Sequence, residues 1–144
     1  MSLLKYSQVP PAAVSPTATV LEAVEMMAEH GVGAVAVVEN KNLKGIFTER
    51  DVMLRVVLRG RNPKETRVGE VMTSPPEVVS GDTSEEDALV QMVERHVRHL
   101  PIVGKDGELK GVLSIRNLLE NRVDELARQL HSLDQYLSND GPGG

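Results

Sequence analysis

Two short segments of the chain repeat one pattern of residues that could bind a sugar. The first runs from Gly45 to Asp51 (GIFTERD) and the second from Gly111 to Asn117 (GVLSIRN). In each, a hydroxyl side chain is followed three residues later by a carboxylate or an amide. A carboxylate such as that of Asp51 can accept hydrogen bonds from both hydroxyls of a ribose, as acidic residues do in dinucleotide folds. The glycine at the start of each segment allows another backbone to approach closely.

The same spacing has a simpler explanation as a helix cap. A threonine followed three residues later by an acidic residue stabilises a helix start by about 1 kcal/mol and is widespread. Its repetition favours ligand binding, and the two roles are compatible. Asn117 lacks the charge of Asp51, and hydrogen bonds to charged groups contribute roughly 1.5–3 kcal/mol against about 1 for neutral ones. We therefore expect a strong site at Thr48 and Asp51, and a weaker or idle one at Ser114 and Asn117.

These segments belong to a repeat that covers most of the chain. Identical residues lie 65 positions apart from Val14 and Val79 to Val38 and Val103, and 66 apart further on. Apolar periodicity and turn residues predict one order in each copy: a short strand, a helix, two strands and a helix. One copy alone would expose a face of its small sheet, so the copies should pack about a pseudo-two-fold axis.

The expected elements give a mixed α/β (α+β) fold. In the first copy we expect a strand near Ala13–Val14 and a helix between Thr19, which opens a capping box, and Gly31, which ends the helix. Two strands should follow at 34–38 and 43–48, and a second helix at about 49–58. The predicted boundaries are 8–67 for the first copy, 68–122 for the linker and second copy, 119–138 for a C-terminal helix and 139–144 for a flexible tail.

Composition limits the classes of function. The chain has 144 residues, 40% of them hydrophobic and 26% charged, as is usual for a soluble globular protein. It contains no cysteine, so disulfides, thiolate zinc sites and cysteine nucleophiles are excluded. The net charge of −5 and the scarcity of aromatic residues disfavour nucleic-acid binding. Apolar runs are too short to span a bilayer and no signal peptide opens the chain, so we expect a cytoplasmic protein with no membrane association.

The C-terminal segment carries a heptad seam. Its apolar residues are spaced alternately by four and three positions: Leu119, Val123, Leu126, Leu130, Leu133 and Leu137. This spacing predicts an amphipathic helix. The helix could fold back on its own domain or pair with a second copy of the chain. The strict spacing favours pairing, and hence a homodimer.

Both G-x-x-[T/S]-x-x-[D/N] motifs, the linker 68–73 (VGEVMT) and the segment 98–101 (RHLP) together resemble a tandem pair of cystathionine-β-synthase (CBS) domains, a Bateman module. The resemblance covers residues 8–122. It implies a regulatory or energy-sensing module, not an enzyme, that requires no cofactor. The implied ligand contains adenosine: AMP, ADP, ATP, S-adenosylmethionine or an NAD-type dinucleotide, bound between the repeats. Dimers of such modules are also common in the family.

The resemblance also assigns roles to residues. The implied ribose-binding residues are Thr48, Asp51, Ser114 and Asn117. The implied phosphate-binding residues are Arg50, Arg98, His99 and Arg116. The implied adenine slot is lined by Val14, Ile46, Val79 and Val112. The basic charge is unequal between the copies, because Gly33 and Ala34 stand in the first copy where the second has Arg98 and His99.

An alternative function is a dimerising scaffold with idle ligand sites, whose C-terminal helix engages a protein partner. The sequence does not identify that partner. A metal site on His96 and His99 is disfavoured, because Pro101 indicates that the helix has ended and no third ligand is near. No motif of a nucleophile and base occurs, so neither a catalytic residue nor a metal ligand is predicted.

Overall fold

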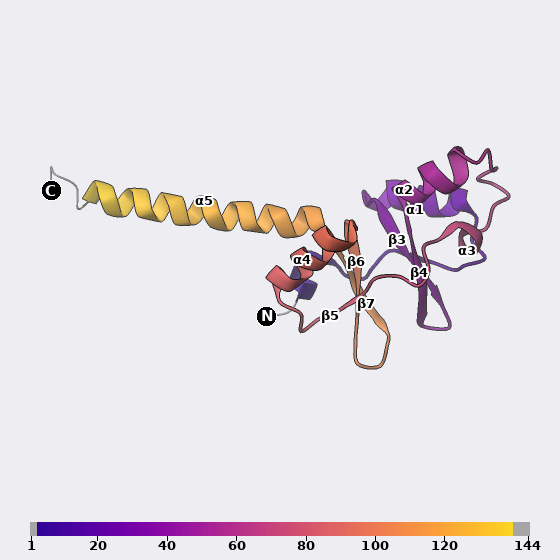
Figure 1. The fold of residues 1–144 in the computed structure, drawn as a ribbon, viewed down its shortest axis with the longest axis horizontal. Helices are drawn as coiled ribbons and strands as arrows, with labels where there is room; N and C mark the ends of the chain where they lie inside the picture. The colour runs from indigo at the N-terminus through magenta and orange to yellow at the C-terminus, as the bar shows by residue number, and fades with distance from the viewer. Residues whose placement is uncertain (1–2, 140–144) are drawn as a thin grey trace.

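Each copy of the repeat folds into one lobe with its own small sheet (Figure 1) in the computed structural model, which describes residues 3–139. The first lobe contains β2 (Ala13–Val14), α1 (Val20–His30), β3 (Ala34–Glu39) and β4 (Asn42–Thr48). The second lobe contains β5 (Val79–Ser80), α4 (Glu85–Arg95), β6 (His99–Val103) and β7 (Leu109–Ser114). In both, the first strand is parallel to the second and the second is antiparallel to the third. The predicted repeat and mixed fold are confirmed.

Local sequence explains the ends of the first helix in each copy. The Thr19 hydroxyl accepts a hydrogen bond from the Glu22 N–H at 3.2 Å, and α1 ends at Gly31 with a φ of 63°. Ser84 caps α4 in the same way. The residue that ends α4, at the position equivalent to Gly31, is His96, with a φ of 57°. A side chain in this left-handed region is strained, so the second copy keeps the turn at some cost in stability.

The N-terminal segment and the linker exchange places between the lobes. β1 (Ser7–Gln8) follows the short helix η1 (Leu3–Tyr6) and pairs with β7 of the second lobe, whose core includes Leu3. In turn α3 (Val68–Val71), in the linker, packs into the core of the first lobe. The two segments lie 65 residues apart, so the repeat begins further upstream than the sequence pattern shows. The N-terminal segment thus completes the second lobe, and the linker completes the first.

Close backbone approach explains the glycine in each motif. Thr73 exchanges two backbone hydrogen bonds with Ile46, of 3.0 and 2.9 Å. A Cβ atom on neighbouring Gly45 would lie 2.7 Å from the Thr73 carbonyl oxygen. On Gly111 it would lie 3.2 Å from the carbonyl oxygen of Gln8, the residue equivalent to Thr73. A side chain at Gly45 would therefore clash with the crossing segment, and one at Gly111 would be tightly packed against it.

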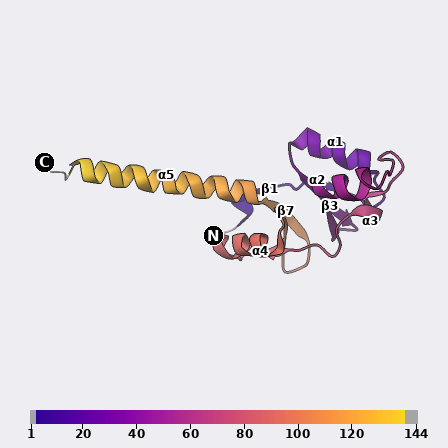
Figure 2. The ribbon, with the colours of Figure 1, turned by 45° about the horizontal axis from the view of Figure 1, so that its top comes forward.

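Two helices differ from the sequence-based expectation. The predicted helix at 49–58 is a short α2 (Glu49–Asp51) followed by the π-helical η2 (Val52–Val57). In the second copy, the equivalent helix and the C-terminal helix are one continuous element, α5 (Ile115–Asn139), which projects away from both lobes (Figure 2). No cap separates them, because helix-forming residues continue through the copy boundary. Of the predicted tail, residues 140–144 lie outside the described residues.

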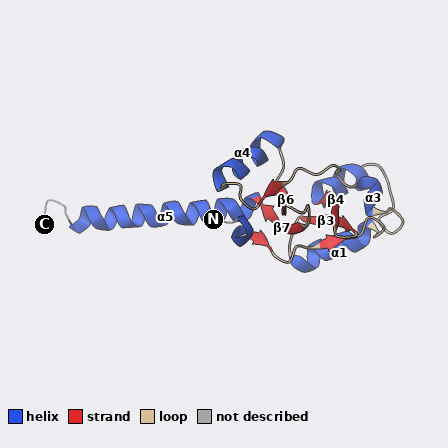
Figure 3. Cartoon of the chain, turned by 90° about the horizontal axis from the view of Figure 1, so that it is seen from below, coloured by secondary structure: helices blue, strands red, loops and turns tan. Residues whose placement is uncertain are grey.

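The two sheets gather between the helices of the two lobes (Figure 3). An isolated bridge between Asn42 and Glu108 joins the β3–β4 hairpin to its counterpart. Each lobe has its own cluster of buried apolar side chains, which includes the fully buried Phe47 in the first lobe and Leu100 in the second. Within residues 3–139, no helix combines the length and apolarity needed to cross a membrane.

Candidate functional site

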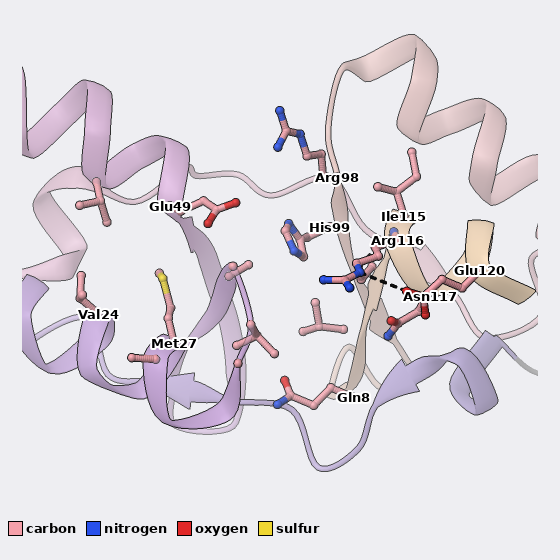
Figure 4. A pocket seen from close by; sticks show the side chains of 18 residues that line it. Gln8, Val24, Met27, Glu49, Arg98, His99, Ile115, Arg116, Asn117 and Glu120 are labelled. Carbon is pink, nitrogen blue, oxygen red and sulfur yellow. Dashed lines mark hydrogen bonds and ion pairs between the residues drawn. The ribbon is translucent and has the colours of Figure 1, made fainter.

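A cleft of about 850 Å³ lies between the two lobes (Figure 4). One wall is built from the start of β6, the end of β7 and the first turns of α5. The opposite wall is built from the C-terminal half of α1, the loop to β3, and two residues after β4, Glu49 and Val52. Gln8 closes one side. This volume lies within the range of small-molecule sites, and the mixture of apolar and polar lining groups is typical of them.

Half of the predicted site residues line this cleft, and all of them come from the second copy. They are Arg98, His99, Val112, Ser114, Arg116 and Asn117. The strand register explains why they meet: His99 at the start of β6 is paired with Ser114 at the end of β7, and α5 begins at the next residue. The sequence motif thus places its hydroxyl and amide on the same wall as Arg98, which precedes β6, and His99, which begins it.

The ribose-type groups in the cleft are only partly engaged by the protein. The Ser114 hydroxyl accepts the Arg116 N–H at 3.2 Å. The Asn117 amide nitrogen donates to the Tyr6 carbonyl oxygen at 3.4 Å, so its side-chain oxygen is not used in that bond. Asn117 is exposed. Both side chains therefore keep acceptor capacity for a ligand.

The charged groups of the cleft are close to balanced. Arg116 donates to the Glu120 carboxylate at 3.1 Å. Among the described residues, Arg98 has no carboxylate within 4.0 Å. Desolvation lowers the pKa of His99; the negative charge of Glu49 acts against this shift, and Arg98 adds to it. The His99 imidazole is therefore neutral at pH 7 and can donate or accept one hydrogen bond.

The predicted first-copy pair, Thr48 and Asp51, lies outside the lining of this cleft. The two residues form a reciprocal capping box, with hydrogen bonds of 3.2 and 3.1 Å. The Asp51 carboxylate also accepts the Thr73 hydroxyl at 3.1 Å and lies 3.6 Å from Arg55 Nε. Asp51 is only 6% exposed. Its carboxylate is thus already held by three protein groups.

The remaining predicted residues are also absent from the lining of the cleft. Val79 is buried in the core of the second lobe, and Val14 packs against the core of the first. Ile46 is buried beside Thr73, and Arg50 is exposed on α2. Of the predicted adenine slot, only Val112 lines the cleft. The ligand-binding roles assigned to these residues stay predictions.

Several lining residues escaped the sequence analysis. Gln8 lines the cleft while its side-chain oxygen accepts the Ala12 N–H at 3.1 Å. Val24 and Met27 contribute apolar surface from α1. Glu49 stands within the first motif but reaches the cleft of the second. The repeat offset could have indicated both polar residues. Gln8 is the equivalent of Thr73, and Glu49 is a charged residue at the position where the second copy has the apolar Ile115.

The two histidines considered for a metal site lie on different elements. His96 ends α4 and His99 begins β6. Across residues 3–139, no group of three or more histidine, aspartate or glutamate side chains is arranged to hold a metal ion. The cleft is instead equipped with hydroxyl, amide and guanidinium groups, which suit a polar organic anion.

Comparison with known proteins agrees with the repeat. The family model of the CBS domain matches residues 6–58 and 68–124. The chain is 42% identical over 114 residues to the CBS domain-containing protein YhcV of Bacillus subtilis, covering 78% of this chain and 79% of that protein. It is 36% identical over 124 residues to the mitochondrial CBS domain-containing protein CBSX3 of Arabidopsis thaliana, covering 83% of this chain but 60% of that protein. It spans 55% of an uncharacterised Methanopyrus kandleri relative that is 38% identical over 107 residues, or 74% of this chain.

Solved structures show the same arrangement. A protein with CBS domains from Burkholderia ambifaria matches with a TM-score of 0.78 and 35% identity, over 85% of this chain and 91% of that one. A CBS domain protein from Pyrobaculum aerophilum, solved in complex with AMP, matches with a TM-score of 0.73 and 28% identity, over 81% and 89% of the two chains.

Proposed function

Because the chain belongs to the CBS domain family, as two such domains in tandem, we propose that it is a regulatory module that binds an adenosine-containing ligand in the cleft between its copies. The observation that carries this proposal is the convergence of six predicted ligand-binding residues on one cleft of about 850 Å³: Arg98, which precedes β6, and five residues from β6, β7 and α5. The AMP complex of the Pyrobaculum relative supports the class of ligand. The matched relatives are CBS domain-containing proteins, which supports a regulatory role.

Each of the six predicted residues in the cleft has a role in this proposal. Ser114 and Asn117 offer acceptors for the ribose hydroxyls, and Val112 offers apolar surface for the base. Arg98 and His99 bind the phosphate. Arg116 would join them by exchanging the Glu120 carboxylate for a phosphate oxygen, an exchange of one charged hydrogen bond for another.

The site predicted at Thr48 and Asp51 remains a second candidate. To bind there, ribose hydroxyls would have to displace the Thr73 hydroxyl, and Arg55 would have to release the carboxylate. Breaking contacts to a buried charge costs about 1–3 kcal/mol each. We therefore propose that the second-copy cleft is occupied first, although its motif carries the uncharged Asn117.

The test is a calorimetric titration of AMP, ATP, NADH and S-adenosylmethionine into wild type, Asn117→Ala and Asp51→Asn. We expect binding to wild type that weakens about tenfold in Asn117→Ala, the loss of one polar contact of about 1.4 kcal/mol, and is retained in Asp51→Asn. Loss in Asp51→Asn alone would move the ligand to the first copy. No binding of any ligand, with an unchanged melting temperature, would favour the scaffold with idle sites.

We also propose that α5 pairs with a second copy of the chain. Every side chain from Val123 to Leu137 is exposed, including the apolar seam. Most of the stability of a helix in a protein comes from packing of its apolar face, so a partner that covers this seam would stabilise α5. An apolar stripe confined to alternate spacings of three and four is the seam of a coiled coil, whereas a helix packed on a globular core carries a wider stripe.

Sedimentation equilibrium tests this pairing. Leu130→Glu places a charge in the seam and should convert a dimer to a monomer, while Gln135→Glu adds the same charge on the outer face and should leave the dimer intact. Wild type that sediments as a monomer at all concentrations would contradict the pairing. A dimer that survives Leu130→Glu would place the contact elsewhere on the lobes.

A further inference from the structure

The two walls of the cleft carry opposite charges at positions that the repeat makes equivalent. After β4, the Glu49 N–H donates to the Gly33 carbonyl at 2.9 Å; after β7, the Ile115 N–H donates to the Arg98 carbonyl at 2.8 Å. The two backbone pairs therefore correspond. At these two positions the first copy has glycine and a carboxylate, at Gly33 and Glu49. The second copy has a guanidinium group at Arg98 and an apolar side chain at the other position.

The Glu49 carboxylate lies over Gly33. A Cβ atom on Gly33 would lie 3.0 Å from Glu49 Oε1 and 3.3 Å from Oε2. In Figure 4 the carboxylate extends from the first-copy wall toward the side of the cleft where Arg98 and His99 lie. It is near enough for its negative charge to act on the imidazole of His99. His99 lies between Glu49 and Asn117 in this view.

The charged side chains that line the cleft determine how much negative charge a bound ligand can carry. Among the described lining residues, two carboxylates, Glu49 and Glu120, balance two guanidinium groups, Arg98 and Arg116, and His99 is neutral at pH 7. Only Arg98 lacks a carboxylate partner among these groups. A ligand with a single phosphate can be matched by Arg98 and the polar groups near it. A chain of three phosphates that extends from the ribose-type groups past His99 would meet Glu49.

We propose that Glu49 is a specificity-determining residue that restricts the cleft to ligands with one phosphate and disfavours those with three. This inference rests on the proposed function and names the charge class of its ligand. Like charges in a partly desolvated cleft repel at an effective dielectric well below that of water. Because Glu49 is exposed, the repulsion is screened by salt, so the selectivity should decrease as ionic strength rises.

The experiment is a titration of adenosine, AMP, ADP and ATP, without divalent cations, into wild type, Glu49→Gln and Glu94→Gln. Glu94 is an exposed residue of α4 that does not line the cleft, so its variant controls for the change in net charge. In wild type and in Glu94→Gln, ATP should bind at least about tenfold more weakly than AMP. In Glu49→Gln this ratio should fall by about tenfold, equivalent to about 1.4 kcal/mol, chiefly through tighter ATP binding.

The two proposals fail in different ways. If AMP binds wild type and the ratio of ATP to AMP affinity is the same in Glu49→Gln, the role of Glu49 is wrong and the proposed function stands. If neither adenosine nor AMP binds wild type, both are wrong. A measurement without ligand checks the geometry: by NMR titration, Glu49→Gln should lower the pKa of His99, since a stabilising negative charge is removed. An unchanged His99 pKa would contradict the placement of Glu49 opposite it.

Discussion

The hydroxyl of Thr73 donates a hydrogen bond of 3.1 Å to the carboxylate of Asp51, joining the linker to the first copy's motif. The equivalent residue in the N-terminal segment, Gln8, instead accepts a hydrogen bond from Ala12. Asn117 therefore has no such bond from the residue that crosses over it. The two copies share one fold, yet one motif is engaged by the chain and the other opens into a cleft.

Thr73→Val should destabilise the protein by about 1–3 kcal/mol. The substitution keeps the shape of the side chain but removes a donor from a carboxylate that is almost fully buried, and a buried charge that loses a partner keeps its desolvation cost. Urea denaturation measures the change. The exposed Thr17→Val, which removes only a hydroxyl that meets Ser15 at the surface, is the control and should change stability by no more than about 0.5 kcal/mol. Equal small effects in both variants would show that the Thr73–Asp51 bond contributes nothing to folding.

The stability of the protein should depend on His99 below neutral pH. Burial lowers the pKa of His99 in the folded chain, so the unfolded chain binds the proton more readily. The contribution of neutral His99 is full above its ordinary pKa of about 6.5 and is lost as pH falls through that value toward the lower folded pKa. Urea unfolding from pH 8 to pH 5 should show a smaller decline in His99→Gln than in wild type. A decline in His99→Gln equal to that of wild type would contradict this dependence.

His96→Gly should stabilise the protein by about 1 kcal/mol. His96 ends α4 at a φ of 57°, a conformation that costs a residue with a Cβ about 1–2 kcal/mol and glycine almost nothing, while glycine adds some entropy to the unfolded chain. Thermal unfolding gives the change. The reciprocal Gly31→His should lose stability by a similar amount, since a Cβ on Gly31 meets no atom within 4 Å and only the backbone strain is felt. A decrease in melting temperature for His96→Gly would show that the imidazole makes a compensating contact.

The sequence predicts those features that depend on neighbouring residues. Thr19 and Gly31 mark the ends of α1, and the alternation of apolar and turn residues marks the strands. The exchange of the N-terminal segment and the linker between lobes was missed, because residues 3–8 (LLKYSQ) and 68–73 (VGEVMT) have no identical pair and each packs on chain far away in sequence. The Asp51 motif is engaged by Thr73 and Arg55, whereas Gln8 leaves the Asn117 motif open to the cleft. Thr73 and Gln8 reach these motifs only through that exchange. The motif itself therefore could not show which copy faces a cavity.

The continuity of α5 has a mechanical consequence. The helix begins at Ile115, in the wall of the cleft, and is anchored to α4 by the ion pair of Arg122 with Glu86, beyond which every side chain to Leu137 is exposed. With 25 residues it is about 37 Å long. Its first turn thus forms part of the wall of the cleft, and the rest of the helix acts as a rigid arm. A tilt of about 5° about Ile115 would displace the far end by roughly 3 Å, given the rise per residue of an α-helix. Motions too small to alter the fold of either lobe are amplified where the seam would meet its partner.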